Sequence, residues 1–370
     1  METYFNCKKL LGFGLMRLPM NGDEVNLEEL NKMVDYYIAH GFNYFDTAHG
    51  YVNGKSELAF KASVSSRHPR NAYLLANKLS GPYFNSEADL EPLFKSQLEA
   101  AGVDYFDFYL MHSQSANEFI KFKNCKAYEF AFKKKAEGKV KHVGLSFHDK
   151  ADVLRQILTE YPEIEFVQIQ LNYVDYGDYN IQSKKCYDVC REFNKVVIVM
   201  EPVKGGHLVN LPEEAKEIYA KENNGSFASY AIRFAASHEG VMTVLSGMSN
   251  MEQMVDNVSY MEDFKPLTDH ENELIKKVAK ICKMKNMIPC TACKYCVDGC
   301  PVNIPIPDLF ADMNANQVYD DWNSEESYKK HTEGKGKASD CIKCGNCEAI
   351  CPQHIQIRDL LVWVKRKFEG

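Results

Sequence analysis

Four side chains with acid–base chemistry occur in succession at the ends of predicted strands. A short apolar strand ends on Asp46, and a loop of small residues then leads to Tyr51. The next two apolar runs along the chain end at Lys78 and at His112. In parallel βα barrels the chemistry is carried at the carboxyl ends of the strands. The spacing therefore predicts that an acid, a phenol, an amine and an imidazole converge on one rim.

The elements that must position these residues alternate between strand and helix. Apolar residues recur at helical spacing over 27–40, where Gly41 is a C-terminal stop, and helices are also predicted over 55–65 and 87–101. The predicted strands are 9–14, 43–46, 72–77, 105–111, 140–145, 166–171, 196–200 and 241–245. Eight such alternating units predict a parallel sheet that closes into an α/β TIM barrel.

With Asp46, Tyr51, Lys78 and His112 in this order, the first two thirds of the chain resemble the aldo-keto reductases, TIM-barrel enzymes with an Asp, Tyr, Lys and His tetrad. The resemblance implies reduction of a carbonyl by a nicotinamide cofactor. A phenol has a pKa near 10 and is a poor acid at neutral pH. Lys78 would lower that pKa in Tyr51, Asp46 would hold the lysine charged, and a neutral His112 would donate a hydrogen bond to the substrate oxygen. The alternative is a structural ion pair beside a core tyrosine and histidine.

The same resemblance implies a set of cofactor contacts along the rim. They are Gly14 in the opening glycine pair, Ser146 and Gln168 at the nicotinamide carboxamide, Met200 at the nicotinamide ring, Lys204 at the pyrophosphate, and Gln253 and Asn257 at the adenosine end. A surface loop is the alternative for Lys204, and a plain turn is the alternative for the glycines.

The chain departs from the family pattern at several of these positions. Phe147 stands where an Asn commonly follows the serine, and Met200 stands where many relatives stack a Tyr. Relatives that prefer NADPH clasp its 2'-phosphate with Lys and Arg, whereas this chain has Gly247 and Gln253. A phosphate without a guanidinium loses its strongest partner. We therefore expect a preference for NADH, or no tight binding of a free nucleotide.

Two cysteine runs near the C-terminus carry the most specific signal. They are Cys290-x2-Cys293-x2-Cys296-x3-Cys300-Pro301 and Cys341-x2-Cys344-x2-Cys347-x3-Cys351-Pro352. In such bacterial ferredoxin runs, three close cysteines hold one 4Fe-4S cluster and the fourth holds the other. The predicted ligand sets are Cys290, Cys293, Cys296 and Cys351, and Cys341, Cys344, Cys347 and Cys300. Zinc is the alternative, but its cysteines usually pair two and two across a long gap.

The cysteine runs define a second domain. Eight of the 13 cysteines lie in 290–370. We predict a barrel over 1–265, a linker and helix over 266–289, and a ferredoxin-like domain over 290–370. Apolar residues between the two runs have helical spacing, so this domain is expected to be mostly helical; they are Leu309, Phe310, Met313, Val318 and Trp322. Residues 324–339 are polar and predict a surface excursion, and 357–368 predict a closing helix.

Composition excludes several classes of function. A net charge of -7 gives no basic surface for nucleic acid. No run approaches the roughly 20 apolar residues of a membrane span, and the first 11 residues lack the apolar core of a signal peptide. We therefore expect a cytoplasmic protein, and in that compartment many cysteines indicate metal or redox chemistry.

Three functions are compatible with these features. The first is an iron-sulfur aldo-keto reductase that interconverts a small carbonyl compound and its alcohol with NAD(H) or NADP(H). The second is a ferredoxin- or flavin-linked reductase, in which a flavin in the barrel bridges one-electron clusters and a two-electron reduction. The third is a redox-partner protein without catalysis. Lysines cluster over 121–141 and would suit an acidic ferredoxin or flavodoxin; a solvated helix face is the alternative.

Overall fold

The computed structural model of the chain describes residues 4–179, 181–222, 225–284, 287–319 and 323–370. The chain forms two compact units. The barrel unit comprises Met1–Gly177, Gln182–Pro202 and Ala228–Thr268, and the cysteine-rich unit comprises Asp178–Ile181, Val203–Phe227 and Asp269–Gly370. The loop that follows the seventh barrel strand thus belongs with the cysteine-rich unit. The predicted boundaries at 265 and 289 divide the chain into continuous segments, whereas each of these units combines segments that are separate in the sequence.

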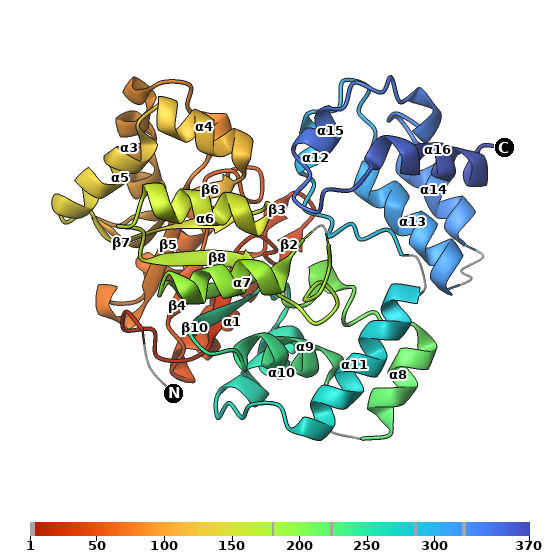
Figure 1. Ribbon diagram of the computed structural model, residues 1–370, viewed down its shortest axis with the longest axis horizontal. Coiled ribbons are helices and arrows are strands. Elements are labelled where there is room, and N and C mark those ends of the chain that lie inside the picture. Colours follow the sequence, from red (N-terminus) through yellow and green to blue (C-terminus); the bar gives the residue numbers. More distant parts are fainter. Residues whose placement is uncertain (1–3, 180, 223–224, 285–286, 320–322) are drawn as a thin grey trace. The chain divides into compact units, whose positions relative to one another are not determined.

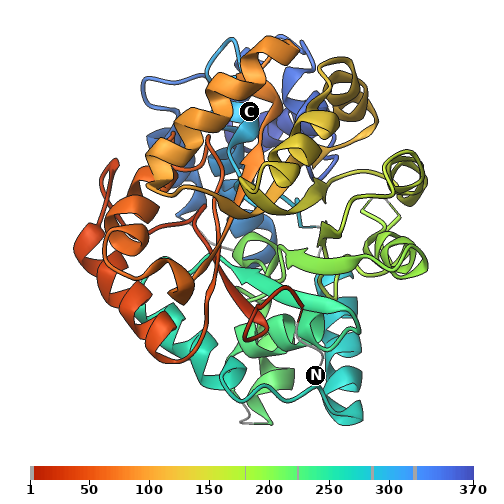
Figure 2. The same cartoon turned by 90° about the vertical axis from the view of Figure 1, so that its left-hand side faces the viewer.

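Eight parallel strands close into a barrel in the order β1-β10-β9-β8-β7-β6-β5-β4, which confirms the predicted fold. The strands are β1 (Leu11–Gly14), β4 (Tyr44–Asp46), β5 (Leu74–Leu79), β6 (Phe106–Gln114), β7 (Val140–Phe147), β8 (Phe166–Gln170), β9 (Val196–Met200) and β10 (Val241–Ser246). They form the centre of the unit, and helices cover the outside (Figures 1 and 2). After β1 the chain forms a small antiparallel hairpin of β2 (Met20–Asn21) and β3 (Glu24–Val25).

The helices of the barrel unit follow the predicted order with shifted ends. They are α1 (Leu27–Ala39), α2 (Ser56–Phe60), α3 (Leu90–Ala101), α4 (Ala116–Asn124), α5 (Ala127–Ala136), α6 (Ala151–Glu160), α7 (Ser183–Glu192), α9 (Phe227–Ala236) and α10 (Met251–Met261). The segment predicted as one helix over 55–65 continues from α2 as a π-helical turn, η1 (Lys61–Ser65). Short 3-10 turns, including η3 (Gly81–Tyr83) and η4 (Glu87–Asp89), follow β5.

Helix α1 illustrates how the sequence directs this packing. The Asn26 side chain accepts a hydrogen bond from the Glu29 backbone N–H and caps the helix. The buried residues of α1 are Leu30, Met33, Val34 and Tyr37, a spacing that forms one apolar stripe. The Tyr37 hydroxyl donates to the carbonyls of Leu11 and Tyr44, at 2.7 Å and 2.9 Å. This helix therefore fixes β1 and β4, the strand that ends on Asp46.

The barrel interior away from the rim is filled by side chains. Its buried cluster includes Tyr44, Ala76, Phe108, Phe166 and Ile198, each from a different strand. A filled interior leaves the rim, where the strands end, as the place for a ligand.

The cysteine-rich unit is mostly helical, as predicted. Its helices are α8 (Glu213–Ala220), α11 (Asp269–Met284), α12 (Tyr295–Asp298), α13 (Ile306–Tyr319), α14 (Ser324–Thr332), α15 (Asn346–Ala349) and α16 (Ile357–Phe368). Helix α8 packs against α11, and α13 packs against α14 (Figure 1). Leu309, Phe310 and Met313 of α13 are buried, and α16 forms the predicted closing helix. Trp322 lies outside the described residues.

The prediction of a surface excursion over 324–339 is wrong for its first half. Residues 324–332 form helix α14, with Ser324, Tyr328 and Thr332 buried. These three residues follow one another at intervals of four positions, so they form a narrow buried stripe along one side of the helix. The Tyr328 ring stacks on Phe368 of α16 at a centroid distance of 4.8 Å. One aromatic residue in a polar segment is a weak sequence signal, and tertiary packing supplies the rest.

Among the helices within the described residues, none combines the length and apolar character needed to cross a membrane.

Candidate active site and candidate metal centres

Lys78 and Asp46 form a buried ion pair at the rim of the barrel. Lys78 lies near the end of β5 and Asp46 ends the neighbouring strand β4. The Lys78 ammonium donates to Oδ1 of Asp46 at 2.5 Å and to the Thr47 carbonyl at 2.7 Å. Burial lowers the pKa of Lys78 and raises the pKa of Asp46, and in each residue the partner's charge opposes the effect of burial. Two of the three ammonium hydrogens are engaged by these acceptors.

Tyr51 completes the contact between the ion pair and the imidazole. Nζ of Lys78 lies 4.6 Å from the centre of the Tyr51 ring, and the ring meets His112 edge-on at a centroid distance of 5.9 Å. Tyr51 is buried apart from 8% of its surface. The structure thus brings Asp46, Tyr51, Lys78 and His112 together, although 66 positions separate the first from the last in the sequence.

His112 lies on β6 next to the hydroxyl of Ser80, a residue for which no role was predicted. Its Nδ1 is 2.6 Å from Oγ of Ser80. Burial, followed by the positive charge of Lys78, holds the pKa of His112 well below its ordinary value, so the imidazole is neutral near pH 7. Ser80 follows Lys78 by two positions at the same strand end. A polar residue directly after strand β5 is the sequence feature that could have identified Ser80 as part of the site.

Ser146 and Gln168 lie opposite each other in the register of β7 and β8. Ser146 Oγ accepts a hydrogen bond from the Ser113 backbone N–H at 2.8 Å, which leaves its own hydroxyl hydrogen for a second partner. Gln168 is buried, and its Oε1 has no hydrogen-bond partner among the described residues. Its Nε2 is 3.6 Å from the Met200 sulfur. A carboxamide offers an acceptor to the serine hydroxyl and a donor to the glutamine oxygen, so these residues fit the amide of a nicotinamide.

The two amides predicted for the adenosine end are engaged within the barrel unit. Asn257 Nδ2 donates to Ser246 Oγ at 2.7 Å, and its Oδ1 accepts from the Tyr260 hydroxyl at 2.6 Å. Gln253 Oε1 accepts from the Ser249 backbone N–H at 2.8 Å. These bonds organise the turn after β10 and the start of α10.

Two further predicted contacts lie at other points of the fold. Gly14 ends β1, where an added Cβ would lie 3.5 Å from the Ser246 carbonyl oxygen. Lys204 begins the 3-10 turn η5 (Lys204–Gly206), which belongs to the cysteine-rich unit, and it is buried there.

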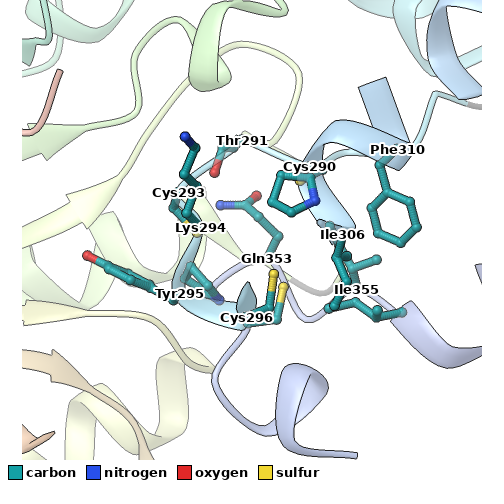
Figure 3. Close-up of a pocket in the computed structure, with 14 residues that line it drawn as sticks. Cys290, Thr291, Cys293, Lys294, Tyr295, Cys296, Ile306, Phe310, Gln353 and Ile355 are labelled. Atoms are coloured by element: carbon teal, nitrogen blue, oxygen red, sulfur yellow. The ribbon is translucent and has the colours of Figure 1, made fainter. Parts of the chain in front are cut away.

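The eight cysteines of the two runs surround two cavities of the cysteine-rich unit. One cavity is lined by Cys290, Cys293, Cys296 and Cys351 (Figure 3). The other is lined by Cys300, Cys341, Cys344 and Cys347. Each cavity thus takes three cysteines from one run and the fourth from the other, which is the arrangement expected from the ferredoxin spacing.

The crossed cysteine sets favour a cluster over a single ion in each cavity. Zinc sites with four cysteines usually take them as two close pairs across a long gap. Three close cysteines and a fourth from the other run are instead the pattern of proteins with two 4Fe-4S clusters. The four thiols of each cavity therefore fit a 4Fe-4S group, and Ile306, which lines both cavities, would help to shield the groups from water.

Comparison with known families decides the class of the barrel. A family model described as the aldo/keto reductase family matches residues 10–280. The chain belongs to this family. A second model, described as a 4Fe-4S dicluster domain, matches residues 289–355 of this aldo-keto reductase. It is therefore an aldo-keto reductase barrel followed by a C-terminal iron-sulfur domain.

Individual relatives of this aldo-keto reductase are distant. The NADH-specific methylglyoxal reductase of Escherichia coli (strain K12) is 24% identical over 285 residues, which cover 65% of this chain and 84% of the relative. The 9,11-endoperoxide prostaglandin H2 reductase of Trypanosoma cruzi (strain CL Brener) is 24% identical over 290 residues, which cover 75% and 93%.

Solved structures show the same barrel. The holo form of aldo-keto reductase AKR11C1 from Bacillus halodurans superposes with a TM-score of 0.62 at 23% identity, over 76% of this chain and 96% of that one. An aldo-keto reductase from Klebsiella pneumoniae in complex with NADPH gives a TM-score of 0.59 at 18% identity, over 74% and 95%. At these identities the likeness establishes the fold.

One loop of this aldo-keto reductase packs directly on a cysteine run. Within the cysteine-rich unit, His207 donates through Nε2 to the carbonyl of Cys290 at 2.6 Å. Gly205 lies so close to Thr291 that an added Cβ would be 2.6 Å from the Thr291 Cα and carbonyl oxygen. The loop after β9 therefore supports the backbone of the first cysteine cavity.

Proposed function

We propose that the protein reduces the carbonyl group of a small molecule to an alcohol with a nicotinamide cofactor, and that Tyr51 is the proton donor. One observation supports this above the others. The Lys78 ammonium is held by Asp46 and the Thr47 carbonyl, and it lies 4.6 Å from the Tyr51 ring centre. This arrangement offers a phenol the positive charge that it needs to act as an acid near neutral pH.

When bound, the reduced nicotinamide supplies a hydride to the carbonyl carbon. The Tyr51 O–H bond breaks as its proton moves to the carbonyl oxygen, so hydride and proton together complete the alcohol. The third hydrogen of the Lys78 ammonium stabilises the phenolate, which solvent then reprotonates. Neutral His112 accepts from Ser80 at Nδ1 and donates from Nε2 to the substrate oxygen as its charge develops.

Ser146 and Gln168 would hold the nicotinamide amide. The serine hydroxyl would donate to the amide oxygen, and Gln168 Oε1, which has no partner within the described part of the chain, would accept from the amide nitrogen. We propose NADH as the preferred cofactor, because Gly247 and Gln253 offer no cation for a 2'-phosphate and the Gln253 amide oxygen is already engaged. The Escherichia coli relative named above is described as NADH-specific.

The two cysteine sets would each hold a 4Fe-4S cluster, which supplies single electrons when bound. The Escherichia coli relative is described as NADH-specific and the Klebsiella pneumoniae structure as a complex with NADPH, so we propose a nicotinamide and not a flavin as the hydride donor.

The lysine cluster on α5 does not support a docking site for an acidic redox partner. Lys133 lies 3.9 Å from Glu137, and Lys134 contacts Glu91 and Glu137 at 2.7 Å. Lys135 pairs with Glu165 at 2.5 Å. Much of the positive charge of this face is balanced within the barrel unit.

Purification without oxygen, with iron and sulfide analysis and assays of NADH oxidation against a panel of aldehydes and ketones, tests the proposal. We expect about eight iron atoms per chain. We expect Tyr51→Phe to lower kcat by more than about 100-fold while the Kd for NADH is retained. Tyr161→Phe is the matched control, because the Tyr161 hydroxyl contacts Glu129 on the surface. Equal rates for wild type and Tyr51→Phe would reject the proposed role.

A further inference from the structure

A second buried carboxylate lies beside the candidate active site and has no part in the proton transfer. Glu57 of α2 is only 1% exposed. Its Oε1 accepts from the Asn77 side-chain amide at 2.7 Å, and its Oε2 lies 2.9 Å from Nδ1 of His49. A buried carboxylate is costly unless it is paired and hydrogen-bonded, and both oxygens of Glu57 are satisfied in this way. Glu57 is therefore held in place by a partner on each oxygen.

His49 is the exposed end of this pair. Its side chain is 29% exposed, in contrast to 1% for the side chain of Glu57. The hydrogen bond to Glu57 is the largest cause of a raised pKa for His49, which favours the imidazolium. The negative end of the pair is thus enclosed by protein, whereas the positive end reaches solvent. Because Nδ1–H is directed to Glu57, the outward donor of the ring is Nε2–H.

The pair is connected to both elements that carry the catalytic residues. His49 lies in the loop between Asp46 and Tyr51, and Asn77 directly precedes Lys78 on β5. The loop packs on η3: the His49 ring meets Tyr83 edge-on at 4.7 Å, and a Cβ added to Gly50 would lie 2.6 Å from the Tyr83 hydroxyl. The conformation of the loop around His49 is therefore fixed by its neighbours.

We propose that His49 is a binding site for an anionic group of the substrate, so that the enzyme prefers carbonyl compounds that carry a carboxylate or a phosphate. This inference rests on the proposed carbonyl reduction. An imidazolium N–H donates a charge-assisted hydrogen bond to either anion, and such bonds are roughly twice as strong as neutral ones. A fixed cation two residues from Tyr51 would orient the opposite end of a short substrate while its carbonyl lies at the phenol.

Matched pairs of probes measure this preference. Succinic semialdehyde against butanal tests a carboxylate, and glyceraldehyde 3-phosphate against glyceraldehyde tests a phosphate. The readout is the ratio of kcat/KM for the charged probe to that for the neutral one. We expect His49→Gln, which retains a donor but not the charge, to lower the ratio by about 10-fold in at least one pair. His49→Arg should restore much of it.

His142→Gln is the matched control. His142 on β7 forms the same kind of contact, with Nδ1 2.9 Å from Oε2 of Glu165, but its position near the start of the strand places it away from the rim. The ratio should not change in this variant. If only the carboxylate pair responds to His49→Gln, the natural substrate is a carboxylate; if only the phosphate pair responds, it is a phosphate.

Binding without turnover gives an independent readout. Succinate and inorganic phosphate cannot be reduced, and calorimetry on the full chain should show at least one of them binding about 10-fold more weakly to His49→Gln than to wild type. Unchanged binding of both anions, with unchanged ratios, would overturn the role of His49. If neutral aldehydes were still reduced in a Tyr51-dependent way, the proposed function would stand. If no aldehyde were reduced, calorimetry alone would decide whether His49 binds anions.

Discussion

The hydroxyl of Ser80 and Nδ1 of His112 are 2.6 Å apart, at the ends of two adjacent strands. The imidazole is buried and neutral, so only one of its nitrogens carries a hydrogen. A hydroxyl that donates to Nδ1 places that hydrogen on Nε2, the atom that can reach a substrate oxygen. Ser80 is therefore a positioning residue for His112.

Ser80→Ala should lower kcat because the tautomer of His112 is no longer fixed. We expect a loss of about 10-fold, the cost of roughly one net hydrogen bond, with the Kd for NADH retained. Steady-state kinetics and nucleotide titration measure the two quantities. Ser80→Thr keeps the hydroxyl and should recover most of the rate, and an unaltered kcat in Ser80→Ala would show that another group orients the ring.

The depressed pKa of His112 also predicts how stability depends on pH. In the unfolded chain this imidazole takes up a proton near pH 6.5, whereas in the folded barrel it stays neutral to much lower pH. Below about pH 6.5 the unfolded state thus binds more protons, and the free energy of unfolding falls as the pH falls, by up to about 1.4 kcal/mol per pH unit. The slope from His112 decreases above pH 6.5 and is almost zero about one pH unit higher.

Urea unfolding at pH 7.5, 6.5, 6.0 and 5.5, followed by circular dichroism, separates this contribution. His112→Asn removes the titrating group, so we expect its stability to fall less steeply below pH 6.5 than that of wild type. Parallel pH dependences in the two proteins would mean that His112 titrates normally in the fold.

Asp46→Asn should damage both stability and rate. The buried Lys78 ammonium would lose its only carboxylate partner among the described residues, and removing one member of a buried pair costs about 3–5 kcal/mol. Burial would then drive Lys78 towards the neutral amine, which no longer stabilises the Tyr51 phenolate. We expect kcat to fall by at least about 100-fold.

Asp107→Asn separates these two effects. Asp107 contacts Arg70 at 2.6 Å near the start of β6, where the chain has no predicted catalytic residue. Thermal melting should show a loss of stability in this variant too, while its kcat per folded molecule stays near wild type. A similar fall in kcat for both variants would attribute the effect of Asp46→Asn to unfolding alone.

The barrel and its strand-end residues could be predicted from the sequence. Parallel strands such as β9 are buried on both faces, so they consist of continuous apolar residues. The candidate catalytic residues lie at the points where such apolar runs end. The cysteine spacing similarly anticipates which thiols share a cavity. Contacts that depend on side chains far apart in sequence were not accessible. No sequence motif marks Glu57, because its role depends on contacts with His49 and Asn77 that form only in the folded chain.

The loop after β9 shows the same limit at the level of a domain. The predicted barrel over residues 1–265 includes the segment of helix α8, yet the contacts of this segment place it in the cysteine-rich unit, against α11. The sequence shows two adjacent glycines at 205 and 206, but it does not show that Gly205 lies against Thr291.

Serine substitutions test which cysteines share a cluster. Cys351 follows the second run but lines the cavity of Cys290, and Cys300 ends the first run but lines the cavity of Cys341. In electron paramagnetic resonance of the reduced protein, we expect Cys351→Ser to perturb the same signal as Cys290→Ser, and Cys300→Ser the same signal as Cys341→Ser. Pairing within each run instead would contradict the crossed arrangement.

Gly205→Ala should weaken the first cysteine cavity from a position outside the cysteine runs. Gly205 has a φ of +64°, and its new Cβ would lie 2.6 Å from backbone atoms of Thr291, which cannot move without shifting the neighbouring Cys290. Gly206→Ala is the control, because its φ is also positive at +102° but the nearest atom to its Cβ is the Asn210 amide nitrogen at 3.7 Å.

We expect Gly205→Ala to retain less iron per chain and to lose its visible absorbance several times faster in the presence of a chelator. Equal losses in the two variants would mean that backbone strain, and not the contact with Thr291, sets the stability of this site.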